Sequence, residues 1–112
     1  MRAVILALPL GLAACSGNGS GPHAEAKQII AARCGMCHKV PGVPAAMGNV
    51  GPPLAGIGTR QVIAGRFPNS RDNLLKWVSH APQMKPGTVM PDTGLTPDQA
   101  AKVVDYLYTL DK

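Results

Sequence analysis

The chain has 112 residues, with 13 Gly, 11 Pro, three Cys and only one Trp, two Tyr and one Phe. This length predicts one small domain, and three cysteines allow at most one disulfide, which excludes a disulfide-rich scaffold. The net charge is +5, but Lys and Arg are scattered and form no run of the kind that binds nucleic acid. So short a chain, with few aromatic residues, is expected to fold around a bound apolar group.

Residues 1–14 are predicted to be a signal peptide of the lipoprotein type. Arg2 precedes an uncharged apolar run, residues 3–14, which is short for a membrane span and is typical of an export signal. The run ends in Leu12-Ala13-Ala14-Cys15, which resembles the bacterial lipobox. An ordinary signal peptide cut nearby and an uncleaved anchor are the alternatives, and either would still export the chain.

Cys15 is accordingly predicted to be lipidated, and residues 15–22, rich in Gly and Ser, to form a flexible tether. The folded domain is then expected at residues 23–112. The sequence predicts a protein of the bacterial envelope, held by lipid at a membrane surface and facing the periplasm or the outer side.

Three segments of the predicted domain have helical signals. Residues 23–40 are expected to begin as a helix, because alanines are frequent and apolar residues recur at helical spacing. Residues 69–81 are predicted as a second helix capped by Ser70 or Asn69. In residues 95–110, Thr96 is the predicted cap, with Pro97 at the first helical position and Gln99 three residues after the cap.

The connecting segments 41–53 and 82–94 are rich in Pro and Gly and are predicted to be long loops. No segment alternates in the manner of a strand. The expected class is therefore all-α, with about three helices joined by long Gly/Pro-rich loops.

Cys34, Cys37 and His38 form the motif Cys-x-x-Cys-His. A structural zinc site usually needs two ligand pairs, and outside the motif only His23 and His80 remain. A thioredoxin-like dithiol normally follows a strand, and none is predicted. The motif is the attachment signature of c-type haem, in which the thiols bond to the macrocycle and the histidine reaches its iron. One covalent haem c is therefore the expected cofactor.

Residues 24–110 resemble a class I cytochrome c. The motifs "CGMCH", "GPPLAGIGTR", "PGTVMP" and "LTPDQAAKVVDYLYTL" occur in the order found in that family. The stretch from "GPPLAGIGTR" to "PGTVMP" is similar to the haem c domain fused to subunit II of some cytochrome oxidases, where the position of His80 is more often Asp or Asn. The resemblance implies a class I cytochrome c fold wrapped around the haem.

The resemblance also implies a set of haem contacts. Met90, in "PGTVMP", would be the second axial ligand opposite His38, with Met84 and His80 as its rivals. The carbonyl of Pro52 would accept a hydrogen bond from His38. Arg60 and Trp77 would lie near a haem propionate, unless Arg60 is simply exposed and Trp77 simply part of the core.

An iron closed by His and Met offers no place for a substrate, and a thioether ligand favours the ferrous state. We therefore expect a single-electron carrier, and not an enzyme, between a quinol-oxidising complex and a terminal oxidase or reductase. One alternative is a permanent haem c subunit of an oxidase or dehydrogenase complex. The other is a ligand-binding or peroxidatic haem protein, which requires a weak or absent methionine bond.

Overall fold

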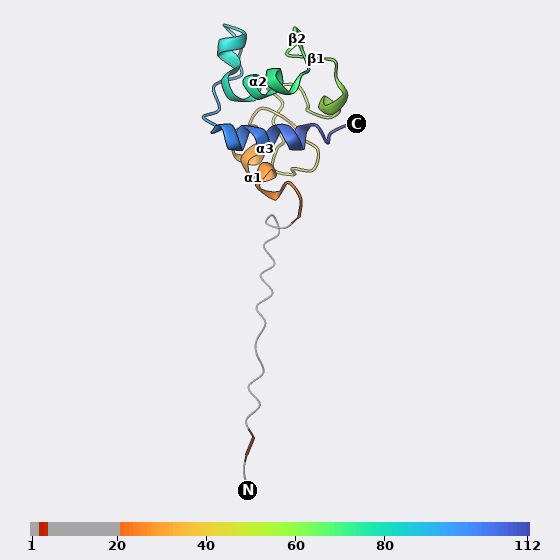
Figure 1. Ribbon diagram of the computed structural model, residues 1–112, viewed down its shortest axis with the longest axis vertical. Coiled ribbons are helices and arrows are strands. Elements are labelled where there is room, and N and C mark those ends of the chain that lie inside the picture. The colour runs from red at the N-terminus through yellow and green to blue at the C-terminus, as the bar shows by residue number, and fades with distance from the viewer. Residues whose placement is uncertain (1–2, 5–20) are drawn as a thin grey trace.

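The computed structural model describes residues 3–4 and 21–112. Cys15 and nearly all of the expected signal peptide lie outside the described residues. The described residues form three α-helices: α1 (Ala24–Arg33), α2 (Arg71–Met84) and α3 (Pro97–Leu107). Helix α3 lies between α1 and α2 and packs against both (Figure 1). In the described part, no helix is long and apolar enough to cross a membrane. The three helices confirm the predicted all-α class.

Helix α1 carries the Cys-x-x-Cys-His motif at its C-terminal end. Ala26 and Ile30, one helical turn apart, are buried in the core shared with α3. The helix ends at Arg33, and the N–H of Cys34 still bonds to the carbonyl of Ile30 at 2.8 Å. The motif therefore begins where the helix stops, on a backbone held by the core.

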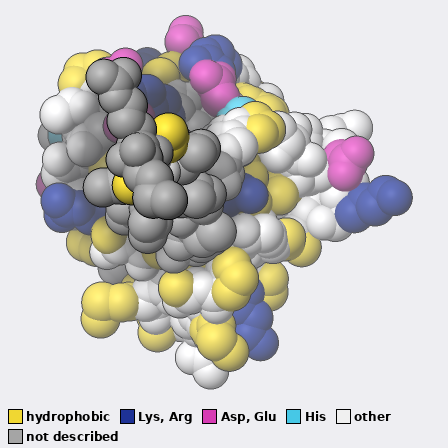
Figure 2. Space-filling view, turned by 90° about the horizontal axis from the view of Figure 1, so that it is seen from below, with side chains coloured by type: hydrophobic (Ala, Val, Ile, Leu, Met, Phe, Trp, Pro, Cys, Tyr) yellow, Lys and Arg dark blue, Asp and Glu magenta, His cyan; other side chains and the backbone are white. Residues whose placement is uncertain are grey.

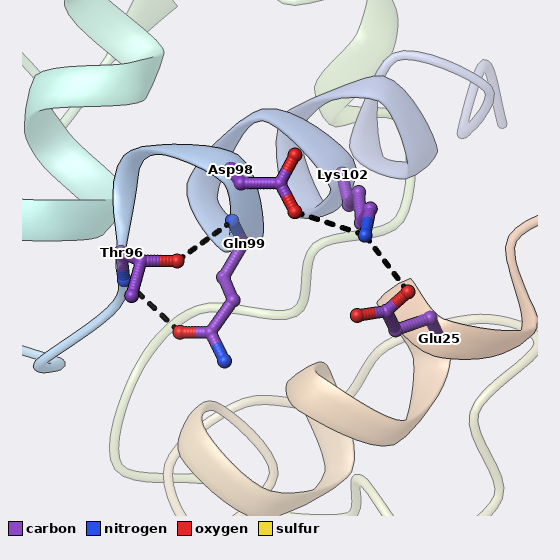
Figure 3. A network of polar contacts seen from close by, with 5 residues as sticks. All are labelled: Glu25, Thr96, Asp98, Gln99 and Lys102. Atoms are coloured by element: carbon purple, nitrogen blue, oxygen red, sulfur yellow. Dashed lines mark hydrogen bonds and ion pairs between the residues drawn. The ribbon is translucent and has the colours of Figure 1, made fainter.

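Helix α3 begins with the predicted cap. The Thr96 hydroxyl accepts from the N–H of Gln99, and the Gln99 side chain accepts from the N–H of Thr96 (Figure 3). Pro97 occupies the first turn, where its missing N–H is not needed. The apolar residues of α3 that recur at helical spacing lie fully in the core: Ala100, Val103, Val104 and Leu107.

Polar contacts join α3 to its two neighbours. Lys102 lies between Glu25 of α1 and Asp98 of α3, at 2.8 and 3.0 Å (Figure 3). On the other side, Arg71 of α2 pairs with Asp105. These pairs are exposed, so each contributes little to the free energy of unfolding.

Helix α2 is longer than predicted. Ser70 caps it by accepting from the N–H of Asn73, which confirms one of the two expected caps. The helix then continues past residue 81 to Met84 across a kink at His80, where φ is −140° and ψ is 53°. Pro82 follows the kink, and the non-helical backbone at His80 is what accommodates a proline inside this segment. The first three residues of the expected loop 82–94 are therefore helical.

A small hairpin and a 3₁₀ turn lie between α1 and α2. Strands β1 (Val62–Ile63) and β2 (Phe67–Pro68) pair antiparallel, and Ile57–Thr59 form the 3₁₀ turn. No strand was predicted, because two-residue strands are too short to show alternation. The hairpin turn uses positive φ at Ala64 and Gly65.

Candidate functional site

The two thiols of the motif lie in a tight turn directly after α1. The N–H groups of Cys37 and His38 both bond to the carbonyl of Cys34, at 3.1 and 3.0 Å. Both thiols are free and partly buried. Burial, with a smaller contribution from the neighbouring Cys37, raises the pKa of the Cys34 thiol to about 11. At neutral pH, Cys34 is therefore an un-ionised thiol.

His38 is held from behind by the loop that follows the motif. Its side chain is buried, and its Nδ1 lies 2.7 Å from the carbonyl oxygen of Pro52. The carbonyl can only accept, so Nδ1 carries the proton and Nε2 is left with its lone pair. The hydrogen bond to Pro52 expected from the sequence is present, and it makes His38 a nitrogen donor of defined orientation.

The backbone of Gly51 packs directly against the His38 ring. A Cβ at this position would be 2.4 Å from Cε1, 2.8 Å from Nδ1 and 2.9 Å from Nε2 of the ring. The N–H of Gly51 also donates to the carbonyl of Cys37 at 2.7 Å. Only glycine leaves room for the ring and this bond together.

Gly48 brings the same loop onto the cysteines. Its N–H donates to the carbonyl of Gly35 at 3.0 Å, and a Cβ would come within 2.4 Å of the Cys37 nitrogen. From the sequence, Gly48 and Gly51 are recognisable only as residues of the predicted loop 41–53, because their close approach to the motif depends on the fold. The one signal in the sequence is that both glycines lie shortly before Pro52, the residue expected to contact His38.

The donor set fits a haem better than a bare metal ion. Within residues 3–4 and 21–112, no group of three or more His, Cys, Asp or Glu side chains is placed to hold a metal ion. Two free thiols three residues apart, followed by an imidazole with an available Nε2, match a cofactor that brings its own four nitrogen ligands and is bonded through carbon. The zinc alternative has no support in this geometry.

Met90 lies in the loop between α2 and α3, which we call the methionine loop and define as residues 85–93. Its side chain is partly buried, and its N–H donates to Thr88 Oγ1 at 3.4 Å. Met84, the rival ligand, ends α2. The second rival, His80, is more than half exposed, with its Nδ1 3.1 Å from Oδ1 of Asp92. In this arrangement the His80 side chain contacts Asp92 at the surface of the protein.

Arg60 and Trp77 have identifiable contacts of their own. Nη2 of Arg60 donates to the carbonyls of Pro53 and Ala55, both at 2.9 Å, so the guanidinium closes the loop that begins at Pro52. Trp77 is partly buried on α2, with its ring centroid 6.2 Å from that of Phe67. Arg60 thus stabilises the loop whose Pro52 carbonyl accepts from His38. A contact of either residue with a propionate stays a prediction.

A protein-family model described as cytochrome c matches residues 23–111. This chain belongs to the cytochrome c family. The match and the helix arrangement confirm the class I cytochrome c fold, and covalent haem c with its iron is the cofactor. The protein is a haem c electron-transfer protein.

Two individual proteins give more detail. The chain is 33% identical over 78 residues to cytochrome c oxidase subunit 2 of Alkalihalophilus pseudofirmus, covering 69% of this chain but 22% of that protein. It therefore spans about a fifth of that relative. A chain in the crystal structure of SoxXA from P. pantotrophus superimposes with a TM-score of 0.61 at 24% identity, covering 82% of this chain and 83% of the other. At that identity the likeness supports the fold alone.

Proposed function

We propose that this cytochrome is a single-electron carrier with one haem c, bonded to Cys34 and Cys37 and held axially by His38 and Met90. The observation that carries the proposal is the His38–Pro52 hydrogen bond at 2.7 Å, which leaves Nε2 as the ligand atom beside two free thiols. When bound, the haem supplies a one-electron iron couple.

The cysteines make the attachment permanent. Cys34 and Cys37 would each hold the haem through a C–S bond to one carbon of a vinyl group, with the thiol hydrogen on the other carbon. Because the tight turn after α1 holds both cysteines, the haem is fixed relative to the α1–α3 core.

His38 and its supports act as a rigid ligand. The Pro52 carbonyl increases the donor strength of the imidazole, and Gly51 allows the loop to press against the ring. Because His38 is buried, water has little access to its ring. A ligand that does not move when the electron arrives lowers the reorganisation that transfer requires.

Met90 would fill the opposite position from the methionine loop. A thioether favours ferrous iron, and a filled position leaves no site for a substrate. We expect Met90→Ala to bind carbon monoxide readily in the ferrous state and to have a lower midpoint potential. Met84→Ala is the matched control and should keep the wild-type values. Wild-type spectra and carbon monoxide binding in Met90→Ala would contradict this ligand assignment.

The partners of the carrier would be a quinol-oxidising complex and a terminal oxidase or reductase. On the face shown in Figure 2, Lys and Arg side chains occupy several separate places, with Asp and Glu among them. This dispersal supports a diffuse attraction to an acidic partner more than one concentrated basic patch. We further propose export to the bacterial envelope and attachment to the membrane through a lipid on Cys15.

A permanent place in an oxidase complex is the second candidate. The similarity to cytochrome c oxidase subunit 2 favours it. A permanent subunit would stay with oxidase polypeptides after mild solubilisation and size-exclusion chromatography, whereas a mobile carrier would separate as a monohaem protein.

A further inference from the structure

The kink in α2 leaves one backbone carbonyl without its usual partner. In a helix the carbonyl of Val78 would accept from the N–H of residue 82, but residue 82 is proline and has no N–H. Val78 is buried, so water is a poor substitute. A buried carbonyl left unpaired is destabilising, and some other group must therefore supply a donor.

Thr93 supplies that donor from the far end of the methionine loop. Its Oγ1 donates to the Val78 carbonyl at 2.7 Å in a buried hydrogen bond, and its N–H reaches the Ser79 carbonyl at 3.4 Å. Thr93 is only 8% exposed, in a loop whose other residues are mostly exposed. Two consecutive carbonyls at the end of the regular part of α2 are thus capped by one residue.

We propose that Thr93 is a positioning residue for Met90, acting through this bond; the inference rests on the proposed Met90 ligation. Three residues of extended chain span at most about 10 Å, so fixing Thr93 restricts where Met90 can place its thioether. The other end of the methionine loop is continuous with α2, where the N–H of Lys85 bonds to the carbonyl of Ala81 at 3.0 Å. Both ends of the loop are therefore anchored on one helix.

The neighbouring His80–Asp92 pair supports the same connection but does not replace it. Both side chains are more than half exposed, and exposed pairs contribute little. The hydroxyl of Thr93 is buried and has a single partner of good geometry. It is therefore the group whose removal should release the loop.

The test compares holoproteins that differ by single side chains. Thr93→Val keeps the shape and removes the hydroxyl, and Thr93→Ser keeps the hydroxyl. Thr109→Val is the matched control, because Thr109 Oγ1 donates to the Tyr106 carbonyl at 2.6 Å, a threonine-to-backbone bond at the end of α3. The measurements are hydrogen exchange in residues 85–93 and the rate of carbon monoxide binding to the ferrous protein.

We expect Thr93→Val to speed both exchange in the loop and carbon monoxide binding, each by roughly tenfold. Thr93→Ser should stay close to wild type, and Thr109→Val should lower only the unfolding midpoint. If Thr93→Val does not accumulate as holoprotein, Thr93→Ala removes the same hydroxyl without placing a methyl group against the carbonyl.

Two failures are distinguishable. Wild-type exchange and wild-type carbon monoxide binding in the Thr93 variants, together with fast carbon monoxide binding in Met90→Ala, would overturn the positioning role. Slow carbon monoxide binding in Met90→Ala would instead overturn the ligand assignment, and with it the role of Thr93 toward the iron.

Discussion

At the scale of single residues, the site depends on how little space surrounds His38. Its ring lies between the Pro52 carbonyl, which accepts from Nδ1, and Gly51, whose missing side chain leaves room for the ring. The carbonyl sets the orientation of the ring and increases its donor strength. The glycine lets the loop come close enough for that hydrogen bond to form.

We therefore expect Gly51→Ala to lower the free energy of unfolding of the holoprotein by about 1–3 kcal/mol, because the added Cβ overpacks the ring. Displacement of the ring weakens its bond to Pro52 and its donor strength, which should raise the midpoint potential. Gly65→Ala is the control. It places a Cβ in open space at a φ of +68°, so backbone strain lowers its stability without a change in potential. An unchanged potential in Gly51→Ala would contradict the support given to His38.

The chemistry of single residues could largely be predicted from the sequence, but of their close neighbours only Pro52 was predicted. Cys34, Cys37 and His38 are recognisable because attachment needs a fixed spacing along the chain. Gly51 and Thr93 act across the fold, Gly51 on a ring 13 positions earlier and Thr93 on a carbonyl 15 positions earlier. No local pattern marks such contacts before the loops are placed.

At the scale of elements, one side chain of α3 holds the loop that follows the motif. The Tyr106 hydroxyl donates to the carbonyl of Pro41, and its ring lies beside His23 and Lys27 at the start of α1. Gly42 makes the approach possible, since a Cβ there would collide with the hydroxyl. Tyr106 therefore joins α1, α3 and the 41–53 loop.

Tyr106→Phe should lower the free energy of unfolding by about 1 kcal/mol through loss of this hydrogen bond. Burial raises the pKa of the Tyr106 hydroxyl above 10.0. The stability that the protonated Tyr106 hydroxyl contributes is therefore fully present below about pH 10, and it is lost as the pH rises through the raised pKa. Tyr106→Phe should lack that part of the alkaline decline seen in denaturant titrations, whereas Tyr108→Phe, which loses a bond to Asn69, should retain it. The same pH slope in Tyr106→Phe and wild type would contradict the role of Tyr106.

Elements with local signals were predicted well. The cap of α3 depends on three nearby residues, Thr96, Pro97 and Gln99. The buried residues of α3 recur at helical spacing. The extension of α2 to Met84 was missed because Pro82 normally ends a helix. Here the kink at His80 and the donor from Thr93 compensate for that proline.

At the scale of the whole molecule, the core of this small domain is built from residues outside the α-helices as well as from the three helices. The segment between α1 and α2 contributes buried residues of its own to the core: Val40, Val43, Ala46, Ile57 and Ile63. A chain with so few aromatic residues would gain apolar bulk from the haem that it binds. We therefore expect the stability of the fold to depend on the haem, and the haem to depend on the fold for its ligands.

The proposed lipid attachment belongs to this scale, because it decides where the carrier works. We expect Cys15→Ser, expressed in a bacterium that attaches haem c, to release holoprotein into the soluble fraction, since acyl chains supply the burial that holds the protein at the bilayer. The fractions are separated by ultracentrifugation and measured by haem absorbance. Wild-type attachment of Cys15→Ser to membranes would contradict the lipid anchor.

The most direct test of the whole account is the intact mass of the native protein, followed by mass analysis of the peptide that contains residues 34–38. We predict the added mass of one haem, retained after denaturation and located on Cys34 and Cys37, with its loss in Cys34→Ser/Cys37→Ser. A native exported chain that carries neither porphyrin nor iron on this peptide would contradict the account at its centre.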